Sequence, residues 1–346
     1  MKRYLYLSFG LWMILSLPAL ACITPVFRYA LENWPADLYE VTVIHNGPLS
    51  AQEQALLKRL KDVSDKDAAN LLVESVDIAG KSKDEVAKLW GSRPSSDLPW
   101  MVVRYPQFTG IKEPMWEDRF TKAAVGKVLN SPLRSKIVKR ILDGDTAFWV
   151  LVKSGVKEKD EAAARLLKEE LKRMERELDF SPEYREYMAE VIGAELKVKF
   201  SLIRLPRGNR EEQLLIQTLL RPIPNVEKIR QPIAFPIFGR GRALCALVGD
   251  EINEENVEEI CYFLVGGCSC QVKGANPGWD LLLSADWDGM LEGQMEEAVF
   301  AGPATVVKGG GAGLPWRNIL IALSSLFVLV AGTTYVILWR RRRYES

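Results

Sequence analysis

The sequence predicts an α/β protein made of two units, followed by a single membrane-spanning helix at the carboxyl end. Strand-like segments alternate with amphipathic helical segments through most of the chain. The second half repeats the order of elements found in the first half. Near the end, Asn318–Trp339 contains no charged residue and is long enough to cross a bilayer as a helix. One larger α/β domain is the alternative to two units.

The amino-terminal residues predict export. Residues 1–21 begin with basic side chains, continue as an apolar run and end in the small-x-small sequence Ala19–Ala21, which is typical of a signal peptide cleaved before Cys22. An uncleaved amino-terminal helix is the alternative. A cysteine at the new amino terminus also suggests lipidation, although Leu20 departs from the usual order of residues before such a cysteine.

The first unit, residues 22–145, begins with a short amphipathic helix that buries Phe27, Leu31 and Trp34. Alternation and β-branching predict strands, and serines before apolar periodic stretches predict helix starts. Residues 108–121 are predicted to be irregular. The expected strands are 39–45, 70–78 and 98–105, and the expected helices are 50–65, 82–90 and two more before Asp143.

The second unit, residues 146–306, opens with a nearly all-apolar strand at 147–155, typical of the middle of a covered sheet. The longest helix follows at 157–179. Further elements are expected as helices from 181, at 209–220 and at 253–265, and as strands at 196–205, 231–238 and 243–248, with a hairpin at 239–242 and a last strand or arm at 279–286. Residues 307–316 form a Gly-rich linker.

The two halves share a sequence of elements. Val41–Gly47 and Trp149–Gly155 are strands that end in a small polar residue and glycine, and in each half a later strand is led by proline, Pro99 or Pro232. This order resembles the thioredoxin-like fold, in which a cis-proline opens the third strand. That family carries a Cys-x-x-Cys motif between its first strand and helix, and neither half has a cysteine there.

A second resemblance rests on the mature amino terminus. Cys22 and the following Thr-Pro-Val-Phe-Arg-Tyr-Ala-Leu-Glu stretch, together with Cys-Ser-Cys-Gln-Val at 268–272, resemble a group of exported bacterial proteins of unassigned function. The resemblance identifies a family and implies no activity.

The carboxyl end predicts where the protein lies. Residues 317–339 are the membrane helix, with Trp316 and Trp339 at the interfaces, and Arg340, Arg341, Arg342 and Arg343 mark the cytoplasmic side. The chain is therefore expected to be a single-pass protein of the cell membrane, with its large domain on the periplasmic side and a basic cytoplasmic tail at 340–346.

The charge distribution gives no argument for a nucleic-acid partner, and none is expected. The formal net charge of the whole chain is +1, but the basic excess lies at the two ends, so residues 22–316 are mildly acidic. Nucleic-acid binding requires a basic surface on the domain itself. Attraction to anionic lipid is expected only at the arginine tail.

Four cysteines fall close together in the second unit: Cys245, Cys261, Cys268 and Cys270. Export permits disulfides, and four cysteines allow three pairings. Cys268 and Cys270, one residue apart and just beyond a helix end, are also the candidates for disulfide exchange or for a soft metal such as Cu(I). The simpler interpretation makes all four structural.

Other candidate sites are weaker. His45, the only histidine, follows a strand at the edge where α/β sheets place ligands, or it is an edge residue with no role. Gly239–Arg242 offers two arginines to an anion, or forms a hairpin turn with exposed arginines. Asp286–Gly289 lacks the remaining ligands of a calcium loop and is expected to be a turn. No motif for a catalytic triad, a phosphate loop or a cofactor is present.

Two hypotheses follow from the sequence. The first is a non-enzymatic extracytoplasmic domain that contacts a membrane or extracytoplasmic protein partner. The second is a thiol–disulfide or thiol–metal protein that uses Cys268 and Cys270.

Overall fold

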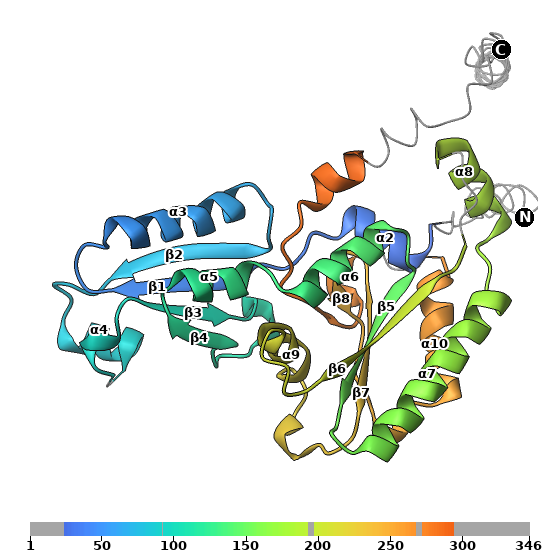
Figure 1. The fold of residues 1–346 in the computed structure, drawn as a ribbon. Coiled ribbons are helices and arrows are strands. Elements are labelled where there is room, and N and C mark those ends of the chain that lie inside the picture. Colours follow the sequence, from blue (N-terminus) through green and yellow to red (C-terminus); the bar gives the residue numbers. More distant parts are fainter. Residues whose placement is uncertain (1–23, 92, 193–196, 268–271, 294–346) are drawn as a thin grey trace, which may run out of the picture. The chain divides into compact units, whose positions relative to one another are not determined.

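The structure, a computed structural model, describes residues 24–91, 93–192, 197–267 and 272–293. These residues form a mixed α/β structure with two sheets (Figure 1), and both sheets belong to one compact unit. The predicted signal peptide, Cys22, Cys268, Cys270, the linker and residues 317–346 lie outside the described residues.

The first sheet has four strands in the order β2-β1-β3-β4. β1 pairs with β2 in parallel and with β3 antiparallel, and β3 pairs antiparallel with β4. Its strands are β1 (Tyr39–His45), β2 (Leu71–Asp77), β3 (Trp100–Arg104) and β4 (Trp116–Arg119), and its helices are α3 (Ala51–Asp65), α4 (Lys83–Trp90) and α5 (Lys122–Leu129). The prediction of an irregular stretch at 108–121 was therefore wrong at β4.

The helix starts in this half follow the expected chemistry. Ser50 and Ser82 each form a capping box, in which the serine accepts from the N–H of Glu53 or Glu85 and that glutamate accepts from the serine. The Leu98–Pro99 peptide bond, just before β3, is cis, and no other described bond is cis. Pro232 therefore leads its strand in the trans form.

The second sheet follows the order β10-β8-β7-β5-β6, with β9 also paired to β7. β5 is parallel to β6 and antiparallel to β7. The strands are β5 (Ala147–Lys153), β6 (Phe200–Pro206), β7 (Ile233–Phe238), β8 (Arg242–Ala243), β9 (Leu247–Val248) and β10 (Trp279–Asp280). All of β5 except Lys153 is buried, as its apolar sequence predicts. The strand expected at 243–248 is broken, because residues 244–246 leave the ladder.

Helices pack against both faces of this sheet (Figure 1). They are α2 (Val26–Asn33), α6 (Pro132–Leu142), α7 (Lys157–Glu177), α8 (Pro182–Ile192), α9 (Gln213–Leu220) and α10 (Glu254–Val265). Short 3₁₀ turns occupy Ser95–Asp97, Gln107–Thr109, Val226–Lys228, Gly249–Glu251 and Lys273–Ala275.

The sequence predicted a boundary between the two units at residue 145, but the hydrophobic cores do not divide the chain there. Phe27 of α2 and Trp34, which follows the helix directly, are buried with Trp149 of β5, and α6 packs on the other face of the same sheet. Both helices precede residue 145, yet they belong to the second core. The first core consists of β1–β4 with α3 and α5.

A carboxyl-terminal arm joins the two cores. After β10 the chain continues as an extended segment, Leu281–Ala285, in which Leu282 packs into the first core while Leu281 and Leu283 pack into the second. The Asn70 side chain fixes the arm: its Nδ2 donates to Leu281 O (3.0 Å), and its Oδ1 accepts from Leu283 N (2.8 Å). The sequence predicted either a last strand or an arm at 279–286. Only Trp279 and Asp280 form a strand, and the residues after Asp280 form an arm.

Within the described residues, no helix is long and apolar enough to cross a membrane. The segment predicted to do so lies outside them.

Candidate functional site

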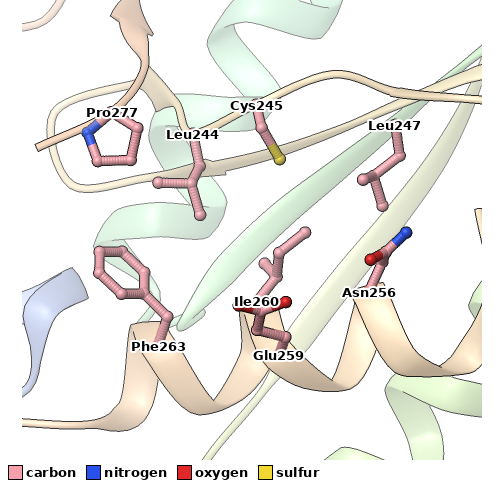
Figure 2. A pocket seen from close by; sticks show the side chains of 8 residues that line it. All are labelled: Leu244, Cys245, Leu247, Asn256, Glu259, Ile260, Phe263 and Pro277. Carbon is pink, nitrogen blue, oxygen red and sulfur yellow. The ribbon is translucent and has the colours of Figure 1, made fainter. Parts of the chain in front are cut away.

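An apolar groove of about 320 Å³ lies between α10 and the chain that links β8 to β9. Ile260 and Phe263 rise from α10 towards Leu244, and the sulfur of Cys245 faces the helix from the opposite wall (Figure 2). The other lining residues are Leu247, Asn256, Glu259 and Pro277. A hollow of this volume and composition suits an apolar side chain better than a polar metabolite.

The periodicity of α10 produces this groove. One stripe of the helix, with Val257, Cys261 and Leu264, is buried in the second core. Asn253 caps the helix by accepting from Asn256 N (2.9 Å), which fixes its first turn. Phe263 lies beside the buried stripe and remains half-buried, so its ring is available to the groove.

The two described cysteines are free thiols, and they do not pair with each other. Burial, followed by the charge of Glu251, raises the pKa of Cys245 to about 11. Burial likewise raises the pKa of Cys261 to about 12, although Arg173 opposes the shift. Both groups are therefore protonated at neutral pH, and a protonated thiol is a poor nucleophile and a poor metal ligand.

His45 is engaged at the carboxyl end of β1. Its Nδ1 lies 2.7 Å from Gly47 O, and because a carbonyl only accepts, Nδ1 carries the proton. Its Nε2 lies 3.0 Å from Ser75 Oγ. Asp77 closes the same turn by accepting from Gly47 N (2.8 Å), and hydrogen bonds from the Ala79 and Gly47 amides hold the pKa of Asp77 below its ordinary value. Neither nitrogen of the ring is left for a ligand.

The corresponding turn after β5 is closed by a carboxylate. Asp160, in the first turn of α7, is 1% exposed. It accepts from Ser154 N (2.7 Å), Ser154 Oγ (2.8 Å) and Gly155 N (3.1 Å). The hydroxyl of Ser154 therefore serves the turn.

The predicted hairpin at Gly239–Arg242 is present and joins β7 to β8, but its arginines are not exposed, so that part of the prediction was wrong. Arg242 is buried and pairs with Asp280 (2.9 Å). Arg240 is nearly covered, donates to Leu31 O (2.8 Å) and pairs with Asp288 (2.5 Å). Both guanidinium groups are already neutralised, which leaves no charge here to attract an anion.

Asp280 also anchors the segment that follows the Cys268–Cys270 stretch. Lys273 Nζ lies 2.5 Å from Asp280 and 2.8 Å from Asp37. Burial and the charge of Asp280 raise the pKa of Asp37 despite this lysine. The network is structural, because it ties the segment before β1 to the segment before β10. Asp286 accepts from Gly289 N (3.0 Å) and caps a helical segment at 287–293, so the prediction of a turn at Asp286–Gly289 was wrong.

The structure brings together only some of the residues predicted to form a site. Cys245 and Cys261 both belong to the same hydrophobic core but remain free, and His45 lies in the other half of the chain. No described group of residues could hold a metal ion. Sequence reasoning missed the groove walls at Asn256, Glu259 and Phe263. The signal that could have found the groove was Phe263, an aromatic residue that lies beside the buried stripe of α10 and stays partly exposed.

Comparisons with known proteins add little. No protein-family model matches the sequence, and no curated protein matches it. Among solved structures, the first two thioredoxin domains of Naumovozyma dairenensis Eps1p are similar at 12% identity and a TM-score of 0.20, over 71% of this chain and 98% of that chain. A TM-score of this size carries no argument, so the architecture must be judged from strand order.

Proposed function

We propose that this protein is a non-enzymatic interaction domain with two thioredoxin-like units, held at the outer face of a membrane by residues 317–339. The strand order supports the two units. In both sheets a central strand, β1 or β5, pairs in parallel with the next strand, β2 or β6, and antiparallel with a third, β3 or β7. A further antiparallel strand follows on the far side of the third.

The single observation that supports a non-enzymatic role is that hydrogen bonds within the protein satisfy the polar groups of the turns after β1 and β5. In thioredoxin-like proteins this turn holds the reactive cysteine. Here the turns contain His45–Pro48 and Ser154–Val156, and their polar groups are satisfied by Asp77 and Asp160. A turn closed in this way supplies no nucleophile.

The groove over α10 is the surface we assign to the partner. Its walls are apolar around Ile260 and Phe263, with Asn256 and Glu259 at its edge, which fits an apolar side chain flanked by polar groups. The proposed partner is a membrane or extracytoplasmic protein at the same membrane face. This location, and kinship with the exported bacterial proteins, are parts of the proposal.

A thiol–disulfide or thiol–metal function is the second candidate. The observation in its favour is that the Cys245 sulfur opens onto the groove (Figure 2). Its raised pKa argues against attack by Cys245 itself, so this function would rest on Cys268 and Cys270.

Site-specific photo-crosslinking in membranes tests the interaction. A photoreactive residue at Phe263 should crosslink one membrane or exported protein, whereas the same residue at Tyr262, which is 54% exposed and outside the groove, should not. Equal crosslinking at both positions would remove the groove from the proposal.

An insulin-reduction assay tests the competing function. We expect no turnover from the wild-type protein. Turnover that Cys268→Ser abolishes and Cys245→Ser preserves would replace the interaction role with the thiol role.

A further inference from the structure

A larger cleft, about 690 Å³, lies where β6 ends. Its walls come from the connection between α5 and α6, from the loop after β6 and from the first turns of α9. The volume is within the range of small-molecule sites. The carboxyl ends of parallel strands, here β5 and β6, are also where α/β sheets bind ligands.

The cleft carries an excess of positive charge. Lys127, Arg207 and Arg210 line it, against the single carboxylate of Glu211. Within the described residues no ion pair involves Arg210, and the carboxylate paired with Lys127, that of Asp118, lies 3.9 Å away. This excess is notable in a domain that is mildly acidic as a whole.

Glu212 does not offset this charge. The side chain is 4% exposed, and its two oxygens accept from Ser131 Oγ (2.5 Å) and Leu133 N (2.7 Å) at the start of α6. Its charge also stabilises the buried guanidinium of Arg134, so it does not pair with a cation of the cleft.

Arg207 has donors without acceptors. Its Nη1 donates to Ile229 O (2.9 Å), but Nε and Nη2 are buried and have no hydrogen-bond partner within the described residues. Burial and the neighbouring Arg230 lower the pKa of Arg207, although the charge of Asp160 opposes the shift. Nε and Nη2 form one side of the guanidinium fork, the side that binds two oxygens of a phosphate. Both atoms are covered in this structure, so a phosphate reaches them only when the Arg207 side chain turns into the cleft that it lines.

We propose that this cleft binds the phosphate group of a small molecule, with Arg207 and Arg210 as its principal contacts. The amides of Asn130 and Gln213 can bind hydroxyls of the ligand, and Ile216 offers an apolar wall to its carbon skeleton. The same chemistry fits a free phosphorylated molecule and a phospholipid headgroup.

Calorimetric titration of the full-length protein in phosphatidylcholine nanodiscs with inorganic phosphate tests the site. We expect saturable binding, weakened at least about tenfold by Arg207→Gln and by Arg210→Gln. Arg210 is exposed and forms no described hydrogen bond or ion pair, so its variant should fold normally even if Arg207→Gln does not. Lys58→Gln on α3, an exposed cation paired with Asp62, is the matched control and should bind like the wild type.

Repeating the titration in phosphatidylglycerol nanodiscs distinguishes the two sources of phosphate. Weaker apparent binding there would assign the site to a headgroup that competes for it, and unchanged binding would assign it to a soluble ligand. Absence of saturable binding below about 10 mM phosphate, or binding that neither variant weakens, would overturn the proposal.

Discussion

At the residue scale, His45 and Asp160 show how two similar turns are closed by different chemistry. His45 holds its turn through Gly47 O and Ser75, with Asp77 as a second acceptor. Asp160 holds the other turn through three donors from Ser154 and Gly155, and the Ser154 hydroxyl also accepts from Val156 N (3.0 Å). The second turn therefore depends mainly on one carboxylate.

Asp160→Ala should lower the free energy of unfolding by about 2 kcal/mol, because it leaves two backbone N–H groups of a partly buried turn without their acceptor. Ser154→Ala removes the hydrogen bond that the hydroxyl donates to Asp160 and the one that it accepts from the exposed Val156 N, and it should cost about 1 kcal/mol. Urea denaturation measures both. Equal effects of the two variants would contradict the role given to the carboxylate.

Cys245 provides a pH-dependent readout. Because its pKa is raised to about 11, its thiolate fraction, and with it the alkylation rate, should rise about tenfold for each pH unit between pH 7.5 and 10. Peptide-resolved mass spectrometry after timed iodoacetamide labelling measures this rate at Cys245 alone. A rate that levels off below pH 9 would show an ordinary or depressed pKa.

At the element scale, α2 is separated from its core partners by most of the chain. Its Val26 N donates to Gly266 O (3.0 Å) at the end of α10, and its Phe27 ring stacks on Phe180 with 5.8 Å between centroids. The helix is thus part of the second core, although β1 follows it directly.

Phe27→Ala should destabilise the protein by about 3 to 5 kcal/mol and should increase amide hydrogen exchange in β7 and α10. Leu60→Ala, at a fully buried position of α3, is the matched variant and should increase exchange in β1 and β2. Exchange that rises in β1 for Phe27→Ala would place α2 with the first sheet.

The sequence was sufficient for elements whose signals are local. Serine caps and apolar stripes placed α3, α4, α7 and α10 within a few residues, and the apolar run at 147–155 marked a central strand. β4 escaped prediction because Trp116–Arg119 has three charged residues in succession and depends on pairing with β3.

Long-range contacts explain the other differences. The partners of Arg240 and Arg242 are Asp288 and Asp280, which are remote in the sequence, so no local pattern indicates burial of these arginines. The same holds for the cleft after β6, whose cations come from two distant segments, α5 and the loop after β6. The groove over α10 was missed because Pro277 and Leu244, which complete it, are distant from the helix in the chain.

At the scale of the whole molecule, the arm Leu281–Ala285 connects the two cores. Arg134, which is 2% exposed, donates to Leu282 O (3.2 Å), and burial lowers the pKa of its guanidinium to about 10. Tyr39 OH donates to Asp280 O (2.7 Å) just before the arm. These contacts bind the arm to elements of both halves.

Leu282→Ala should cost about 2 to 5 kcal/mol and loosen the first core, whereas Leu283→Ala should have a similar cost and loosen the second. Hydrogen exchange, compared between α5 and α9, measures the distinction. Loosening of the same core by both variants would show that the arm does not alternate between them.

The position of Leu282 also determines when the first half can finish folding. A ribosome makes residues 39–129 long before it makes residue 282, and an export channel would deliver them in the same order. Until then the buried position of Leu282 in the first core is unfilled, and Asn70 lacks its hydrogen-bond partners on the arm. The nascent first half must therefore persist as an incomplete, chaperone-accessible intermediate until the final tenth of the domain emerges, and any mutation that delays the arm will prolong its exposure.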